Sequence, residues 1–243
     1  MDANKMDERI EGVQFSPIFR EDTLGDFKDI CKDNYKDFLK LFFLSKDIND
    51  YLESKRKEGD NSSKEYFTRL FNIRIRDHFS SSFILISQGF IVDAISLTRS
   101  SLEDLLVIIN FYINKKFFNQ WYENKEEFKV VVGNLRQNVK NSSIFEKEDG
   151  EFFDNVYGAL SNIVHPKLNS VRLMSTYHPS FNNLDAINLK KYTDLIILSY
   201  YTYEIQICNF LENIYPDDKE KLKLIKQTLN DDISIKSLIN LEK

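Results

Sequence analysis

Apolar residues recur along most of this chain at spacings of three, four and seven, the spacing of one face of an α-helix. The pattern predicts helices at residues 24–57, 64–88, 90–114, 126–139, 148–165, 188–215 and 217–229. Ser62 or Ser63 is the expected N-cap of the second helix. The helix at 188–215 is apolar nearly all round, so it should lie at the centre of the fold.

The segments between these helices complete the predicted organisation. Residues 1–21 lack a period and are expected to form an irregular arm, followed by a single domain at 22–243. A short aromatic segment at 117–125 should lead into the helix at 126–139. Residues 167–187 also lack a period and predict a long connection, which in a compact domain is often functional. The predicted fold is an all-α helical bundle with a long N-terminal helix and a short C-terminal helix.

Composition supports this architecture and narrows the function. Seven glycines and four prolines in 243 residues are too few for the many turns of an all-β fold. A net charge of −5 argues against a surface that coats nucleic acid throughout, although it permits a local basic patch. The most continuous apolar stretch, residues 105–113, is well short of the roughly 20 residues that span a membrane. We therefore expect a cytoplasmic protein without a membrane partner.

Several common catalytic motifs are missing from the sequence. It contains no glycine-rich phosphate loop, no G-x-S-x-G nucleophile motif and no H-E-x-x-H zinc motif. The three histidines, His78, His165 and His178, are not at metal-ligand spacing, and the two cysteines form no C-x-x-C pair. We expect neither a cofactor nor a metal.

The helix predicted at 148–165 carries the first candidate site. Its apolar side faces away from a polar side that includes Ser161, Asn162 and His165, and Pro166 ends the helix. The helix dipole there favours a protonated imidazole by about 0.3–1 kcal/mol, so His165 could exchange a proton near neutral pH. The alternative is a solvated polar face on which His165 only caps the last carbonyls.

Charged pairs form the second candidate site. Arg99 and Glu103 are four residues apart and flanked by aliphatic side chains, which predicts a partly buried ion pair. Such a pair either ties two helices together or belongs to a functional site. Arg69 and Arg76 are seven apart and share a helix face, so they could contact phosphate, although solvated charge is the alternative.

Two groups of residues together resemble a known family. They are Gly89, Ala94, Arg99 and Glu103 on one helix, then Trp121, and then Tyr157, Leu160, Ser161, His165 and Pro166. Over about residues 64–215 this pattern resembles uncharacterised bacterial all-helical proteins allied to the HEPN superfamily. The resemblance implies a HEPN-like four- to five-helix core, often dimeric. It also implies a role in bacterial antiviral defence or toxin–antitoxin systems, as a metal-independent ribonuclease or as a non-catalytic partner.

The chain departs from the catalytic pattern of that family, which is an arginine followed after four to six residues by a histidine. The corresponding positions before His165 hold Gly158, Ala159 and Leu160. The spacing occurs once, from Arg172 to His178, in the predicted loop, where Arg172 could contact nucleic acid.

Two hypotheses follow. The first is an RNA- or protein-binding module with a degenerate catalytic motif, with RNA, a protein from a neighbouring gene and a second copy of the chain as partners. The alternative is an endoribonuclease with His165 as general acid and base. In that case Ser161 and Asn162 would orient it, and Arg99, paired with Glu103, would supply positive charge.

Overall fold

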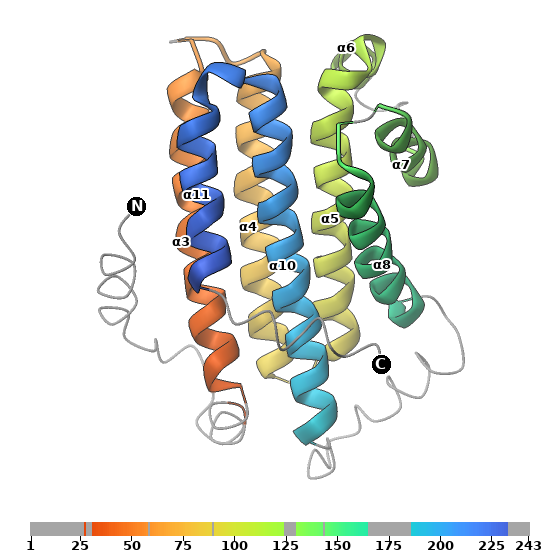
Figure 1. Cartoon of the computed structure of the whole chain (residues 1–243). Helices are drawn as coiled ribbons and strands as arrows, with labels where there is room; N and C mark the ends of the chain where they lie inside the picture. The colour runs from red at the N-terminus through yellow and green to blue at the C-terminus, as the bar shows by residue number, and fades with distance from the viewer. Residues whose placement is uncertain are drawn as a thin grey trace.

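In the computed structural model, most of the described residues belong to helices, as the apolar spacing of the sequence predicts (Figure 1). The structure describes residues 27, 31–57, 59–88, 90–123, 130–142, 144–164 and 186–232. Its α-helices are α3 (Lys32–Lys55), α4 (Lys64–Ser87), α5 (Ile91–Ile113), α6 (Lys115–Glu123), α7 (Val132–Asn141), α8 (Lys147–Val164), α10 (Ala186–Ile214) and α11 (Lys219–Asp232). A 3-10 turn, η2 (Pro216–Asp218), joins the last two. These residues contain no strand, so the all-α prediction is confirmed; the arm at 1–21 and the connection at 167–187 lie outside them.

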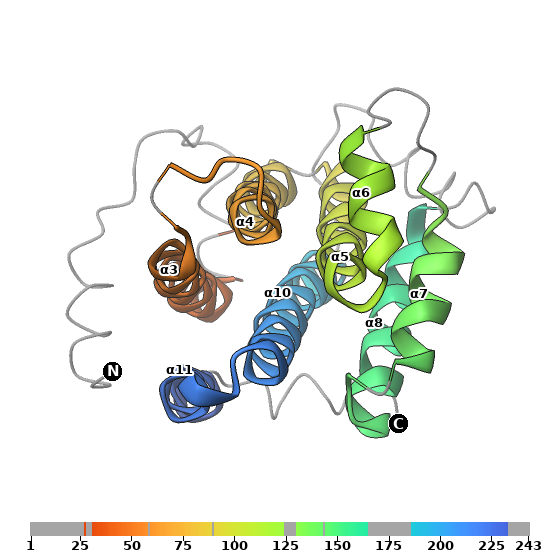
Figure 2. The same cartoon turned by 90° about the horizontal axis from the view of Figure 1, so that it is seen from above.

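The helix α10 lies at the centre of the bundle, as its nearly continuous apolar surface predicted. It packs against α3, α4, α5, α8 and α11, and the view along the bundle shows it between them (Figure 2). The buried apolar side chains of these helices join into one core cluster. Its largest fully buried side chains include Phe79 on α4 and Tyr200 on α10, whose rings stack with centroids 4.2 Å apart. None of the helices in the described ranges is long and apolar enough to cross a membrane.

Polar contacts inside this core fix how α10 sits against its neighbours. Asn34 of α3 donates a hydrogen bond to Asp194 of α10 over 2.6 Å, and Tyr203 of α10 donates to the buried Asn72 of α4. Buried polar pairs of this kind select one helix register, because any other arrangement leaves them without partners. We infer that they specify the bundle more than they stabilise it.

The helix boundaries follow the sequence closely, with one correction. Ser63 caps α4, as expected, by accepting a hydrogen bond from the backbone N–H of Tyr66 at 3.2 Å. The aromatic segment expected as a lead-in is instead a helix, α6, and the next helix, α7, begins at Val132 rather than at 126. The reason is tertiary packing: Trp121 of α6 lies against Phe67 and Phe111, with ring centroids 5.0 and 4.9 Å apart.

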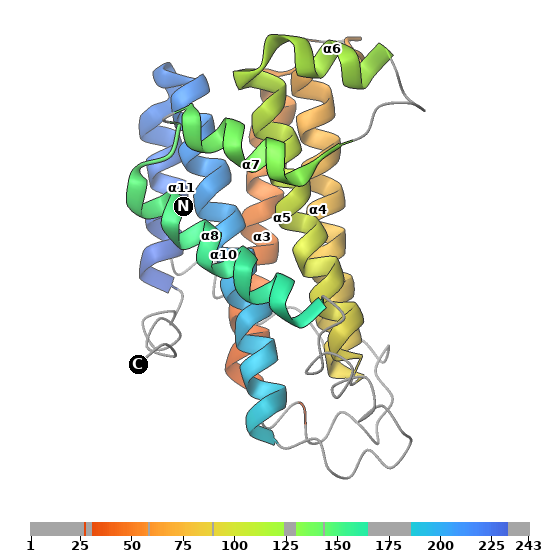
Figure 3. The same ribbon diagram turned by 90° about the vertical axis from the view of Figure 1, so that its right-hand side faces the viewer.

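The helices α7 and α8 cross the flank of the bundle formed by α5 and α10 (Figure 3). Asn110 of α5, fully buried, holds α7 by donating to the carbonyl of Leu135 at 3.2 Å and accepting from Asn138 at 2.9 Å. The start of α8 is held by α10, because Asn209 donates to the Asp149 carboxylate at 2.8 Å. These contacts set the positions of α7 and α8, on which the candidate site depends.

Candidate binding site

The Arg99–Glu103 pair forms as the sequence predicted. Arg99 Nε lies 3.0 Å from Glu103 Oε1, and the two side chains are 22% and 27% exposed, so the pair is partly buried. Tyr157 of α8 joins both: its hydroxyl donates to Glu103 Oε1 at 2.8 Å and accepts from Arg99 Nε and Nη2 at 3.2 and 3.1 Å. The pair therefore ties α5 to α8, as the structural interpretation of the sequence requires.

Tyr157 acts here as a neutral phenol. Burial raises the pKa of its hydroxyl, the hydrogen bond to Glu103 raises it further, and the bonds from Arg99 only partly offset these effects. A phenol with a raised pKa is a poor nucleophile and a poor base at neutral pH. The guanidinium of Arg136, from α7, lies over the Tyr157 ring at 4.7 Å from its centroid. Tyr157 thus connects all three helices.

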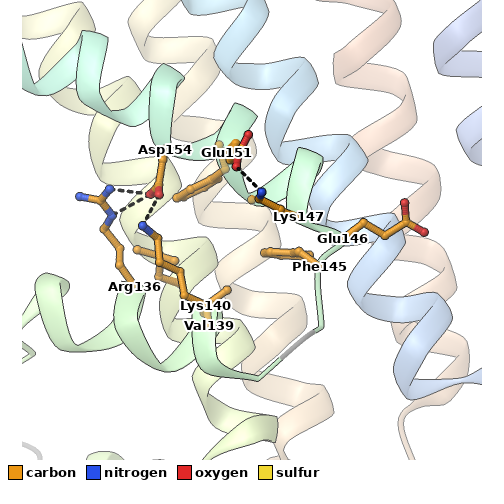
Figure 4. Close-up of a pocket in the computed structure, with 11 residues that line it drawn as sticks. Arg136, Val139, Lys140, Phe145, Glu146, Lys147, Glu151 and Asp154 are labelled. Atoms are coloured by element: carbon orange, nitrogen blue, oxygen red, sulfur yellow. Dashed lines mark hydrogen bonds and ion pairs between the residues drawn. The ribbon is translucent and has the colours of Figure 1, made fainter.

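A second charged cluster joins α7 to α8 (Figure 4). Arg136 Nη2 and Lys140 Nζ each lie 2.5 Å from an oxygen of Asp154, and Arg136 Nε donates to the same carboxylate at 3.2 Å. Burial opposes ionisation of Asp154, but the hydrogen bonds from Lys140 and Arg136 outweigh it and lower the pKa of its carboxyl. Two cations thus share one carboxylate, so these three groups together carry one excess positive charge.

Beside this cluster α5, α7 and α8 enclose a pocket of about 550 Å³, called the α7–α8 pocket below. Its lining residues are Leu106, Arg136, Val139, Lys140, Phe145, Glu146, Lys147, Gly150, Glu151, Phe153 and Asp154 (Figure 4). The apolar members form the floor: Leu106, Val139 and Phe153 are 1%, 7% and 4% exposed. Lys147 and Glu151 form the rim, since their side chains are 89% and 66% exposed, whereas Arg136 and Asp154 are 30% and 21% exposed. Six of the eleven lining residues are charged, so the pocket combines a small apolar floor with charges of both signs around it.

Gly150 keeps one wall of the pocket open. It lies in the first turn of α8, and a Cβ built on it meets no atom within 4 Å. Gly158, two turns further along α8, has equally open space but does not line the pocket. Gly150 shares a face of α8 with Lys147, Glu151 and Asp154, which also line the pocket, so we expect a large side chain at Gly150 to extend into it. Gly158 does not line the pocket, so we expect the same change there to leave the pocket open.

The other residues predicted at the catalytic site lie further along α8. Ser161 and Asn162 belong to its last turn, where Ser161 is half-buried and Asn162 is exposed. The hydroxyl of Ser161 is buried without a hydrogen-bond partner among the described residues. His165 and Arg172 lie outside these residues. The structure thus brings Arg99 and Glu103 to α8 but does not join them to Ser161.

Two of the three arginines predicted to contact nucleic acid, Arg69 and Arg76, face α3. Arg69 Nε lies 2.9 Å from Glu53 Oε2, and Arg76 lies over the ring of Phe42 at 5.2 Å from its centroid. Every arginine in the described ranges has a carboxylate partner within 4 Å. These are Arg56, Arg69, Arg74, Arg76, Arg99 and Arg136. Pairing does not hide every guanidinium group, since the Arg74 side chain remains 57% exposed.

The sequence interpretation missed the α7 side of the site. Arg136 and Lys140 are four residues apart, so they share a helix face, and Asp154 lies on the polar side predicted for α8. These signals were present, but only the crossing of α7 and α8 brings the three together.

Within the described ranges, no group of three histidine, cysteine, aspartate or glutamate side chains could hold a metal ion. The chain matches no model of a known protein family, no curated protein and no solved structure.

Proposed function

We propose that the protein is a non-catalytic helical binding module that engages a partner protein through the α7–α8 pocket. The observation that carries this proposal is the pocket itself, with its buried apolar floor and charged rim between three helices. Interfaces draw most of their binding energy from a few large side chains that enter such pockets. At about 550 Å³ the pocket is large enough for one aromatic or branched anchor.

The walls of the pocket are held in place before any partner binds. Asn110 fixes α7 to α5, Tyr157 fixes α8 to α5, and Asp149 fixes the start of α8 to α10. A pocket whose walls are already ordered loses little conformational entropy on binding, so more of the contact energy appears as affinity. This rigidity supports a binding role.

Protein is favoured over RNA as the partner. RNA affinity comes largely from arginine and lysine contacts to phosphate. Two of the three arginines predicted for that role, Arg69 and Arg76, are paired with Glu53 and Asp77, and the chain carries a net charge of −5. By its resemblance to HEPN-like proteins, the module would serve as the non-catalytic member of a defence or toxin–antitoxin pair, with a partner encoded by a neighbouring gene.

A second candidate, a metal-independent endoribonuclease, is favoured by one contact. Tyr157 joins Arg99 to α8, the helix that leads toward His165. In that role His165 would transfer protons and Arg99 would stabilise the charged phosphate. The guanidinium of Arg99 is, however, already engaged by Glu103 and Tyr157.

Incubation of the purified protein with total RNA separates the two candidates. We expect the wild type and the His165→Ala variant to degrade RNA equally and at the level of a buffer control, because a binding module needs no general acid or base. Gel electrophoresis of the RNA over time is the measurement. Cleavage by the wild type that His165→Ala abolishes would replace the proposal with the second candidate.

A further inference from the structure

The charges around the α7–α8 pocket are divided between its two ends. At the α7 end, Arg136 and Lys140 share the single carboxylate of Asp154, leaving an excess positive charge. Lys147 and Glu151, 3.7 Å apart on α8, balance one another. At the end where the chain enters α8, Glu146 lines the pocket without an ion-pair partner among the described residues. The close-up view shows Glu146 on the opposite side from Arg136, with Phe145 and Lys147 between them (Figure 4).

The apolar floor lies between these ends. Leu106 and Phe153 are buried there, and Phe145 packs against the core while also lining the pocket. A lone anion would match the α7 end but would leave the Glu146 end uncompensated. A purely apolar group would fill the floor but would make no ion pair with the charged groups at either end. A complementary occupant therefore has an apolar group in the middle and opposite charges on its two sides.

We propose that the α7–α8 pocket recognises a segment of the partner protein in which a large apolar side chain lies between an acidic and a basic residue. The apolar side chain enters the floor, the acidic group meets Arg136 and Lys140, and the basic group meets Glu146. A polypeptide presents these three groups on neighbouring residues and so satisfies the pocket with one short segment. This inference rests on the proposed function, because it names what the binding module takes into its pocket.

Short blocked peptides test the proposal with the intact protein. The probe is acetyl-Asp-Phe-Lys-amide, and its matched controls are acetyl-Asn-Phe-Gln-amide, which lacks both charges, and acetyl-Asp-Ala-Lys-amide, which lacks the anchor. Binding is followed by ligand-observed NMR titration with the wild type, Gly150→Phe, Gly158→Phe and Lys140→Gln. The two glycine variants make the same change on the same helix, and only the first changes a residue that lines the pocket. Lys140→Gln removes one cation while Arg136 continues to hold Asp154.

We expect the charged phenylalanine peptide to bind the wild type and Gly158→Phe equally and to show no binding to Gly150→Phe. The alanine peptide should not bind. Lys140→Gln should weaken binding about two- to fivefold, because a rim ion pair contributes little. Removing both peptide charges deletes two such pairs and should weaken binding by about four- to 25-fold. Lys140→Gln should not weaken binding of the uncharged peptide further, which identifies the acidic group as its counterpart.

Three results would overturn the inference. They are no binding of the charged peptide to the wild type, equal binding to Gly150→Phe, and equal affinity for the charged and uncharged peptides. The proposed function fails separately, on the partner protein itself. If Gly150→Phe still abolishes partner binding while the peptides do not bind, the pocket is the site and only the charge pattern of its occupant is wrong.

Discussion

Replacing Glu204 with glutamine is expected to remove a pH dependence of stability that the wild type shows above about pH 4.5. Glu204 of α10 is fully buried, and neither carboxylate oxygen has a hydrogen-bond partner among the described residues. Burial raises the pKa of its carboxyl well above the ordinary 4.5; the nearby Ser45 hydroxyl lowers it, and the Asp47 carboxylate raises it further. The native protein therefore keeps this proton over a pH range in which the unfolded chain has released it.

The sign of the effect follows from this difference in bound protons. Because the unfolded state binds fewer protons, the free energy of unfolding falls as pH rises from 4.5 toward the folded-state pKa. The slope for one group is about 1.4 kcal/mol per pH unit. Glutamine cannot ionise, so the stability of Glu204→Gln relative to the wild type should increase with pH by that amount.

Denaturant unfolding of both proteins between pH 5 and 8 measures this difference. Subtracting the two curves cancels the contributions of Asp37 and Asp104, whose pKa values burial raises to about 6. The matched control is Glu220→Gln on α11, whose side chain is 90% exposed and which should follow the wild type at every pH. Parallel curves for the wild type and Glu204→Gln would show that Glu204 is ionised in the native state.

Replacing Asn110 with alanine is expected to destabilise the protein by about 2–4 kcal/mol and to loosen α7 in particular. The fully buried side-chain amide of Asn110 links α5 to α7 through two hydrogen bonds. It donates to the Leu135 carbonyl and accepts from the Asn138 amide. Alanine removes the acceptor of the Asn138 amide and the second donor to the Leu135 carbonyl, and it opens space beneath α7. The packing of α4 against α5 does not depend on this amide, so α4 should keep more of its hydrogen-exchange protection than α7 does.

Hydrogen exchange measured by mass spectrometry, together with denaturant unfolding, tests this expectation. Protection in the α7 range Val132–Asn141 should fall more than protection in α4. Gln137→Ala is the matched control, because this exposed α7 side chain bonds, among the residues that the structure describes, to Asn141 of its own helix alone. It should change stability by less than about 0.5 kcal/mol. Equal loss of protection in α4 and α7 would mean that Asn110 supports the whole bundle rather than the placement of α7.

The fold class could be predicted because the helices are long and their apolar spacing is regular. The Arg99–Glu103 pair was also predictable, since both members lie on one helix, four residues apart. The α6 helix could not be predicted in this way, because it is stabilised by packing of Trp121 against Phe67 and Phe111, which belong to other helices. Sequence spacing therefore predicts a contact within one helix, but it does not predict packing between helices that are distant in sequence.

The site illustrates the same limit. Tyr157 was noticed only as part of a family-like pattern, and its hydrogen bonds to Arg99 and Glu103 depend on how α8 packs against α5. The pocket exists only where α5, α7 and α8 come together, so no single segment signals it. Glu204 was hidden for another reason: a glutamate in a helix is expected at the surface, and only the all-round packing of α10 buries it.

A pull-down from the native host tests the binding proposal most directly. The tagged baits are the wild type, Gly150→Phe and Gly158→Phe. Quantitative mass spectrometry of the bound proteins, after circular dichroism has shown that all three are folded, is the measurement. We expect the wild type and Gly158→Phe to recover the same partner in equal amounts, and Gly150→Phe to lose it, because only that variant changes a residue that lines the pocket. Equal recovery by all three proteins, or no specific partner for the wild type, would contradict the account.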